Sequence, residues 1–161
     1  MISLNIKDIK NFMNHLLLKD TFDSFLVRDA QINTAAFFQI DGHINQDFFN
    51  EDERVHHTED YIFWNDVRPI AYEIIKGKKV PTGLKITFAF PKSKYPGLIK
   101  EGDLPFDENQ ISGMYLHIHY DGESVQIITG TSLSLFTMDK SLDSYWDSVL
   151  SRFLSSHFET I

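Results

Sequence analysis

The sequence predicts a single α+β domain in which helices pack against one antiparallel sheet. Several short runs carry apolar residues at every second position and are separated by turn signals, which is typical of antiparallel strands. Three other stretches carry apolar residues at spacings of three and four, which predicts two helices within the chain and a third at its C-terminal end. The 161 residues fit one domain, since a domain holds roughly 100–200 residues.

The stretch from Gly113 to Thr137 is the one around which the rest of the chain is organised. Its first run alternates, with Tyr115, His117 and His119 on one face and a second, apolar set on the other face: Met114, Leu116, Ile118 and Tyr120. Asp121-Gly122 follows and predicts a two-residue type I′ turn, because both central positions of that turn need a positive φ. A second strand and then a third strand or extended run complete the stretch.

The chain before this stretch predicts a strand, a helix and a pair of strands. Residues 2–6 alternate and predict a short strand, and the spacing over about 8–18 predicts an amphipathic helix with Asp8 near its start. Residues 25–40 predict two strands or one long bent strand, followed by a second hairpin turn at Asp41-Gly42. The acidic segment 46–60 predicts a loop with a short helical turn at 47–50.

The next elements are a helix over Tyr61 to Lys76, a strand over 84–90 and a C-terminal helix over 139–158. Pro69 lies inside the first of these helices, so we expect that helix either to start near Val67, with Asp66 as its N-cap, or to kink at the proline. Gly77 is suited to follow its last turn. The segment 91–110 predicts a long connection with one helical turn at 95–100.

The two halves of the chain, 1–58 and 59–161, have related element orders. Each half contains a helix and an Asp-Gly turn signal, and the sequences around the two Asp-Gly pairs, FFQIDGHI and HIHYDGES, are weakly alike. This similarity suggests an internal duplication.

Composition limits the classes of function. The chain has no cysteine, which excludes disulfides, thiolate nucleophiles and cysteine-ligated metals. Its net charge of −8 disfavours indiscriminate binding to nucleic acid, where lysine and arginine neutralise phosphates. The N-terminus has no basic region followed by an apolar run, and no apolar run reaches the roughly 20 residues that span a bilayer. We therefore expect a cytoplasmic protein that does not bind membranes.

Three stretches are familiar as a set: Lys19–Asp23, Arg68-Pro69 with Ile75–Pro81, and Thr129–Leu133 with Phe136–Lys140. On these stretches the chain resembles, over most of its length, a family of small bacterial proteins of uncharacterised function. The resemblance implies a soluble protein that stands alone, and it implies no activity, cofactor or site.

In element order alone, the chain is similar to one domain of the DNA sliding clamps, in which helices face the DNA. A ring needs several such domains, and the C-terminal helix has no counterpart there. The resemblance implies that lysines on or beside the first two helices contact nucleic acid, namely Lys7, Lys10, Lys78 and Lys79. The interpretation predicts binding that weakens as salt rises.

Two further groups of residues are candidate sites. His117 and His119 lie on one face of a predicted strand, about 6–7 Å apart, and two neutral imidazoles at that spacing suit a metal once a third ligand joins them; the alternative is a solvent-facing strand surface. At the end of the last helix, Phe153, Leu154 and Phe158 carry more apolar surface than one sheet needs to cover it. Such a surplus predicts a protein interface.

No group of residues has the spacing of a catalytic site or a phosphate-binding loop. The sequence therefore favours a non-catalytic interaction or regulatory module, without a cofactor, that binds a protein partner or itself. A nucleic-acid-associated protein and a metal-binding protein around His117 and His119 are the alternatives.

Overall fold

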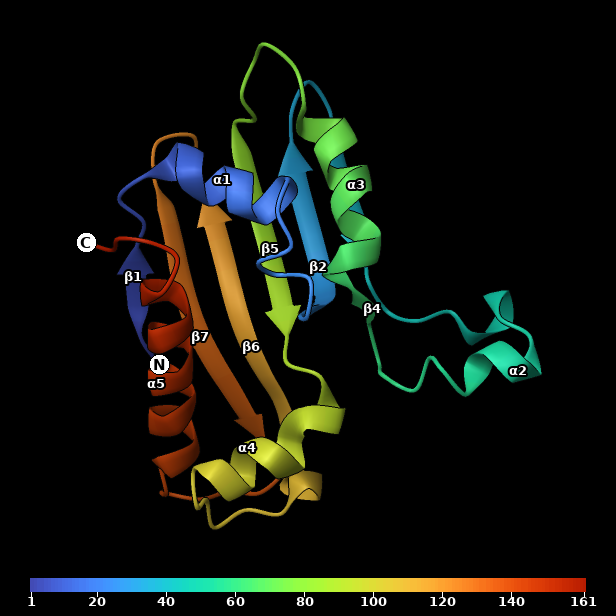
Figure 1. Ribbon diagram of the computed structural model, residues 1–161, viewed down its shortest axis with the longest axis vertical. Helices are drawn as coiled ribbons and strands as arrows, with labels where there is room; N and C mark the ends of the chain where they lie inside the picture. Colours follow the sequence, from blue (N-terminus) through green and yellow to red (C-terminus); the bar gives the residue numbers. More distant parts are fainter.

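The computed structural model, which describes residues 1–161, is a single α+β domain (Figure 1). Its seven strands are β1 (Ser3–Asn5), β2 (Leu26–Asn33), β3 (Phe37–Asp41), β4 (Ile62–Phe63), β5 (Gly83–Ala89), β6 (Ile111–Tyr120) and β7 (Val125–Leu133). Its five α-helices are α1 (Ile9–Leu17), α2 (Glu51–Arg54), α3 (Trp64–Ile75), α4 (Tyr95–Glu101) and α5 (Ser141–Ser155). The predicted fold class is confirmed.

All strand pairs are antiparallel and form one sheet. The strand order is β1-β7-β6-β5-β2-β3, and β4 pairs with the start of β2. The strands from the first part of the chain lie on opposite sides of the central strands, because β1 pairs with β7 whereas β2 pairs with β5. The long β6–β7 hairpin and β5 occupy the middle of the sheet, as expected from the apolar alternation of residues 114–120.

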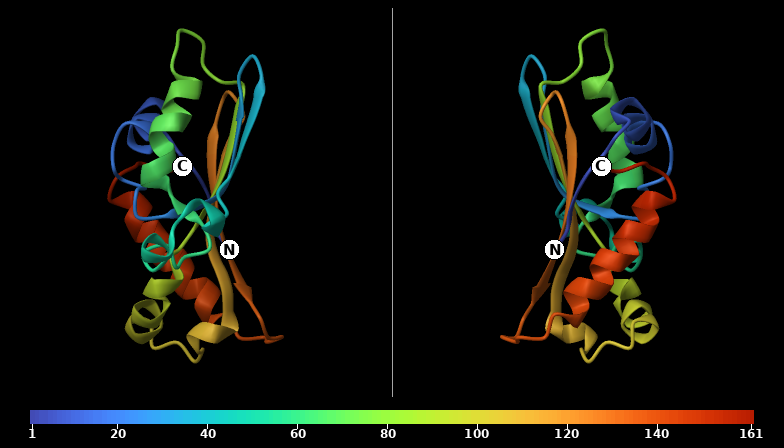
Figure 2. Two further views of the ribbon diagram at one scale, coloured as in Figure 1. Left: turned by 90° about the vertical axis from the view of Figure 1, so that its right-hand side faces the viewer. Right: turned by 90° about the vertical axis from the view of Figure 1, so that its left-hand side faces the viewer.

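The long helices α1, α3 and α5 and the shorter α4 all cover one face of the sheet (Figure 2). Between this face and the helices lies a core of 30 buried residues. Aromatic rings dominate its centre: Phe22 packs against Phe12, Phe88 and Phe158 with ring centroids 5.6–6.1 Å apart. The opposite face of β6 carries Tyr115, His117 and His119 beside polar residues of β5 and β7, and no helix covers it.

The local signals for α1 act as predicted. The Asp8 carboxylate accepts a hydrogen bond from the Asn11 backbone N–H at 3.1 Å, which satisfies one of the free donors of the first turn. The apolar spacing places Phe12 and Leu16 in the core. Helix α1 therefore follows from its own sequence.

Helix α3 begins at Trp64 and Pro69 lies inside it, so the first of the two predicted alternatives, a start near Val67, is wrong. Contacts with distant parts of the chain determine where the helix begins. The Trp64 backbone N–H donates to Phe25 O at 3.0 Å, and its buried indole N–H donates to Leu16 O at 2.9 Å. These contacts outweigh the missing side-chain cap at the start of the helix.

Both predicted Asp-Gly turns need correction. The β2–β3 turn lies at residues 34–36, and Gly42 follows β3 without reversing the chain. A Cβ on Gly42 would lie 1.7 Å from Val27 O, so glycine is required there for a close approach of two backbone segments. The β6–β7 loop has four residues, because the Asp121 carboxylate accepts from the Glu123 and Ser124 N–H groups. No third strand follows β7.

The predicted interface at the end of α5 is also corrected. Leu154 and Phe158 are buried in the core. Phe153 is half-buried, and its ring lies 5.6 Å from the rings of both Phe22 and Phe25. Two of the three side chains are therefore core residues, and only Phe153 keeps part of its surface exposed.

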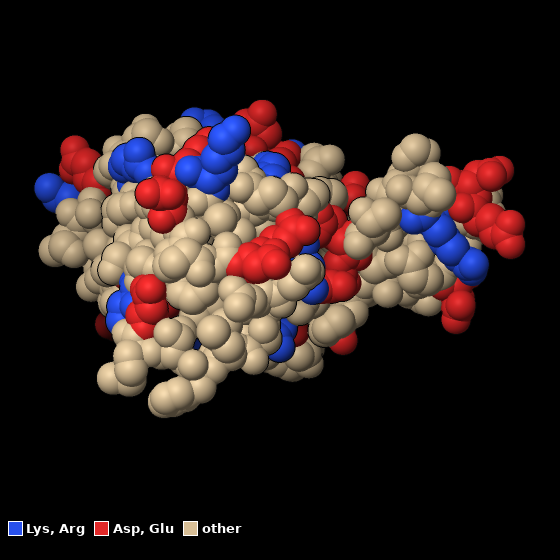
Figure 3. Space-filling model, turned by 90° about the horizontal axis from the view of Figure 1, so that it is seen from below, with Lys and Arg blue, Asp and Glu red and all other residues tan.

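The segment from Ile44 to Asp60, between β3 and β4, projects from the body of the protein, and we call it the arm (Figures 1 and 3). It contains a 3-10 turn at Gln46–Phe48 and the short helix α2, which agrees with the predicted acidic loop containing a helical turn. Backbone bonds close its base, since Ile44 N–H donates to Asp60 O at 2.9 Å and Ile62 N–H donates to Gly42 O at 2.8 Å.

None of the helices is long and apolar enough to cross a membrane.

Candidate functional site

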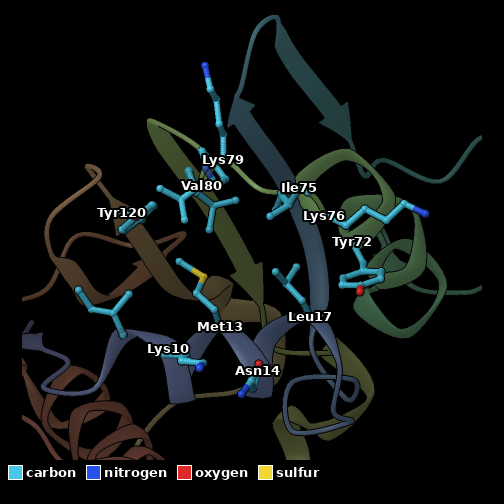
Figure 4. A pocket seen from close by; sticks show the side chains of 14 residues that line it. Lys10, Met13, Asn14, Leu17, Tyr72, Ile75, Lys76, Lys79, Val80 and Tyr120 are labelled. Carbon is cyan, nitrogen blue, oxygen red and sulfur yellow. The ribbon is translucent and has the colours of Figure 1, made fainter.

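A cavity of about 630 Å³ opens between α1, the end of α3, the loop that follows α3, and the adjoining ends of β5 and β6 (Figure 4). Most of its wall is apolar, formed by Ile9, Met13, Leu17, Ile75, Val80, Pro81, Leu84 and Tyr120. Its polar lining is Lys10, Asn14, Tyr72, Lys76 and Lys79. The volume lies within the range of about 300–1,000 Å³ that is usual for ligand sites.

Helix α1 supplies one wall because its apolar stripe is wider than the core requires. Phe12 and Leu16 point into the core, whereas Ile9, Met13 and Leu17 lie on the neighbouring strip at helical spacing and face the cavity. Lys10 follows on the same side of the helix and reaches solvent. The helix thus gives the cavity an apolar wall with a cation at its mouth.

The opposite wall depends on how α3 ends. Gly77 has a φ of +143°, a region that favours glycine, and it turns the chain away from the helix axis directly after Lys76. The loop then passes Lys79 and Val80, and Pro81 is buried where the chain enters β5. Val80 remains 74% exposed, which leaves an apolar side chain open at the rim.

The cavity is electropositive although the protein as a whole is acidic. Its lining includes three lysines and no Asp or Glu, against a net charge of −8 for the chain. Lys76 forms an exposed ion pair with Glu73 at 2.6 Å, and that hydrogen bond raises the pKa of the Lys76 ammonium. Lys10 and Lys79 form no ion pair. In Figure 4 the lysine side chains stand at the rim, around an apolar floor.

The structure separates the four lysines that were predicted to contact nucleic acid. Lys10 and Lys79 lie on opposite walls of the cavity. Lys7 precedes α1 and approaches the Glu159 carboxylate at 3.5 Å, and Lys78 is exposed in the loop after α3. Half of the set therefore belongs to one concave site, and the nucleic-acid hypothesis itself stays a prediction.

The two predicted metal ligands lie on the uncovered face of the sheet. His117 Nδ1 is 3.2 Å from Thr87 Oγ1, and burial, followed by the charge of Arg28, lowers the pKa of the His117 imidazole. His119 is exposed beside Lys85. No group of three or more His, Asp or Glu side chains lies close enough together to hold a metal ion, so the third ligand that the hypothesis requires is not supplied.

The sequence did not reveal the cavity, although each of its parts carries a signal. The apolar strip of α1 looks like core, and Lys76–Lys79 looks like a helix end whose cations match the helix dipole. Only the packing of α1 beside α3 brings the two segments together. The sequence signals for the cavity are the excess of apolar residues on α1 and the single valine, Val80, directly after Lys78 and Lys79.

A family model described as a family of unknown function, DUF5721, matches residues 15–159, which is most of the chain. The chain belongs to this family. The DUF5721 match includes the cavity residues from Leu17 to Tyr120, whereas Ile9, Lys10, Met13 and Asn14 precede it. The predicted resemblance to an uncharacterised family is thereby confirmed.

Two of the stretches that carried that resemblance meet in the DUF5721 fold. Arg68 on α3 binds Asp23 through two parallel hydrogen bonds, both 2.9 Å long. This pair fastens the connection between α1 and β2 to α3. No curated protein and no solved structure matches the chain, so the likeness to the sliding clamps stays a prediction.

Proposed function

We propose that this protein is a non-catalytic binding module and that the cavity between α1 and α3 holds an apolar group of a protein partner that carries negative charge beside it. One observation carries the proposal. The apolar cavity has charged side chains of one sign only, and two of them, Lys10 and Lys79, have no carboxylate partner.

The arrangement favours a ligand with two parts. An apolar group gains free energy when it leaves water for the floor formed by Met13, Leu17 and Leu84, at roughly 25 cal/mol per Å² of buried apolar surface. A carboxylate held near Lys10 or Lys79 gains more than it would on an open surface, because the apolar wall lowers the local dielectric. A partner with only an apolar group would contact the floor alone, and a partner with only a negative charge would contact the lysines alone.

The lining supports binding rather than catalysis. It contains no imidazole and no carboxylate, which are the side chains that most often serve as general acids and bases. The same lining favours an anion with an apolar neighbour over the phosphate backbone of a nucleic acid, which has no apolar group to place between Lys10 and Lys79. The lining therefore supports the interaction module better than the nucleic-acid-associated protein.

A fluorescent aromatic anion, 8-anilinonaphthalene-1-sulfonate, tests the site without knowledge of the partner. We expect the folded protein to enhance its emission saturably, with one site per chain. The double variant Lys10→Glu/Lys79→Glu should abolish that enhancement while unfolding at the same urea concentration as the wild type. Both side chains are exposed, so their replacement does not disturb the core.

The matched control is Lys85→Glu/Lys100→Glu, which changes the net charge equally at exposed positions outside the cavity. It should retain the wild-type emission. Equal loss in both double variants would mean that only the net charge matters, and no loss in either would mean that the dye binds elsewhere. Either result would contradict the proposed site.

A further inference from the structure

The arm exposes apolar side chains beside acidic side chains, which complements the apolar and basic lining of the cavity. Phe48 is 81% exposed and Val55 is 68% exposed. Four acidic residues flank these apolar side chains: Asp47, Glu51, Asp52 and Glu53. The arm therefore presents an exposed aromatic group on a segment in which these four carboxylates outnumber the one guanidinium, that of Arg54, and Figure 3 shows acidic side chains at its outer end.

The tip of the arm is an ordered unit. The Asn50 side chain accepts from the Glu53 N–H at 2.8 Å, and the Glu53 carboxylate accepts from the Asn50 N–H at 3.1 Å, so the two residues cap α2 reciprocally. The Phe49 ring stacks on His57 with centroids 3.9 Å apart. These contacts fix the chain beside Phe48, so that the Phe48 ring points outward and does not pack against the body of the protein.

We infer that the arm of one copy docks into the cavity of a second copy. The Phe48 ring enters between the apolar walls, and the carboxylates around it face Lys10 and Lys79. This inference rests on the proposed function, since it names a second copy of this chain as the partner that the cavity binds. Charge complementarity supports it: the tip of the arm is acidic, and the charged lining of the cavity is entirely basic.

The contact is between copies, because the arm cannot reach the cavity of its own chain. Its base is closed by the His43–Tyr61 bridge and by the bond from Ile44 N–H to Asp60 O. From that base α2 extends away from α1 and from the end of α3 where the cavity lies (Figure 1). Reaching the chain's own cavity would require those bonds to open.

Arm and cavity are different surfaces, so the association is head-to-tail. Each copy then has one arm and one cavity to offer, which produces a ring if the rotation between copies closes and an open chain if it does not. The tip of the arm forms a small interface, so we expect a dissociation constant between about 1 μM and about 1 mM.

Sedimentation velocity over that concentration range tests the inference with two complementary variants. Phe48→Ser removes the aromatic group of the arm and leaves the cavity intact. Lys10→Glu/Lys79→Glu reverses the cavity charges and leaves the arm intact. The wild type should show a mass that rises with concentration, and each variant alone should remain a monomer. An equimolar mixture of the two variants should form a dimer and nothing larger, because only one arm and one cavity remain functional.

Two controls make the test specific. Phe136→Ser removes a ring that is 95% exposed and lies in the β7–α5 connection, and it should associate like the wild type. The quadruple variant Glu51→Lys/Asp52→Lys/Lys10→Glu/Lys79→Glu, in which arm and cavity exchange their charges within one chain, should associate again, whereas Lys10→Glu/Lys79→Glu alone does not.

A wild type that stays monomeric to about 1 mM, or variants that associate as the wild type does, would overturn the inference. The dye experiment separates this failure from failure of the proposed function. Monomeric protein that still binds the dye through Lys10 and Lys79 would mean that the cavity takes a different partner.

Discussion

Replacing Gly42 with alanine should destabilise the protein. The added Cβ would lie 1.7 Å from Val27 O, whereas Cβ atoms essentially never approach within 3.0 Å of another heavy atom, so the backbone has to move by more than 1 Å. That shift stretches the bonds from Gly42 N–H to Arg28 O and from Ile62 N–H to Gly42 O, now 3.0 and 2.8 Å. Each is worth about 0.5–1.5 kcal/mol, which gives a loss of about 1–3 kcal/mol.

Urea unfolding followed by circular dichroism measures this loss, and a thermal melt should show a decrease of roughly 2–12 °C, at about 2–4 °C per kcal/mol. Gly97→Ala is the matched control. Gly97 lies inside α4 with no atom within 4 Å of an added Cβ, so alanine should stabilise the protein there by up to about 1 kcal/mol. Equal midpoints for Gly42→Ala and the wild type would refute the close approach at Gly42.

Three further outcomes are expected. A double-mutant cycle with Arg68→Met and Asp23→Asn should give a coupling free energy of about 1–3 kcal/mol, since both side chains are at most 20% exposed; a value near zero would mean that solvent screens the pair. Burial, and then a nearby arginine, lowers the pKa of His117, so below its ordinary pKa the unfolded chain binds a proton that the folded protein does not. The urea midpoint should therefore fall between about pH 7.5 and pH 5.5, less in His117→Gln than in His119→Gln, and equal slopes would contradict the burial argument. Leu154→Ala should cost about 2–5 kcal/mol, because this residue is buried, whereas an interface residue would show no loss in a monomer.

The elements that local sequence determines were predicted well. The alternation of residues 114–120 and the strand over 84–90 match β6 and β5, because period-two spacing and burial on one face are enough to define a half-buried strand. The turn predicted at Asp41-Gly42 failed for a tertiary reason. At Gly42 the glycine serves a close approach to Val27, and a dipeptide signal cannot distinguish that requirement from a turn.

The candidate site was less predictable because it is assembled from distant segments. Lys10 and Lys79 were expected to act together, but as contacts for nucleic acid. The apolar floor between them became visible only when α1 packed beside α3. The surplus expected at Phe153 is smaller for a similar reason: its ring packs against Phe22 and Phe25, and no contact between these segments was predicted.

The position of β1 has a consequence for how the protein folds during synthesis. This strand pairs only with β7, and the Ile2 N–H binds Thr129 Oγ1 across a separation of 127 residues. During synthesis β1 has no partner until β7 has emerged, and the segment after α5 then secures it, since Ile161 N–H donates to Asn5 O at 2.8 Å. Such non-local pairing slows folding, so a truncated chain that ends before β7 leaves its N-terminal residues unpaired and open to proteases.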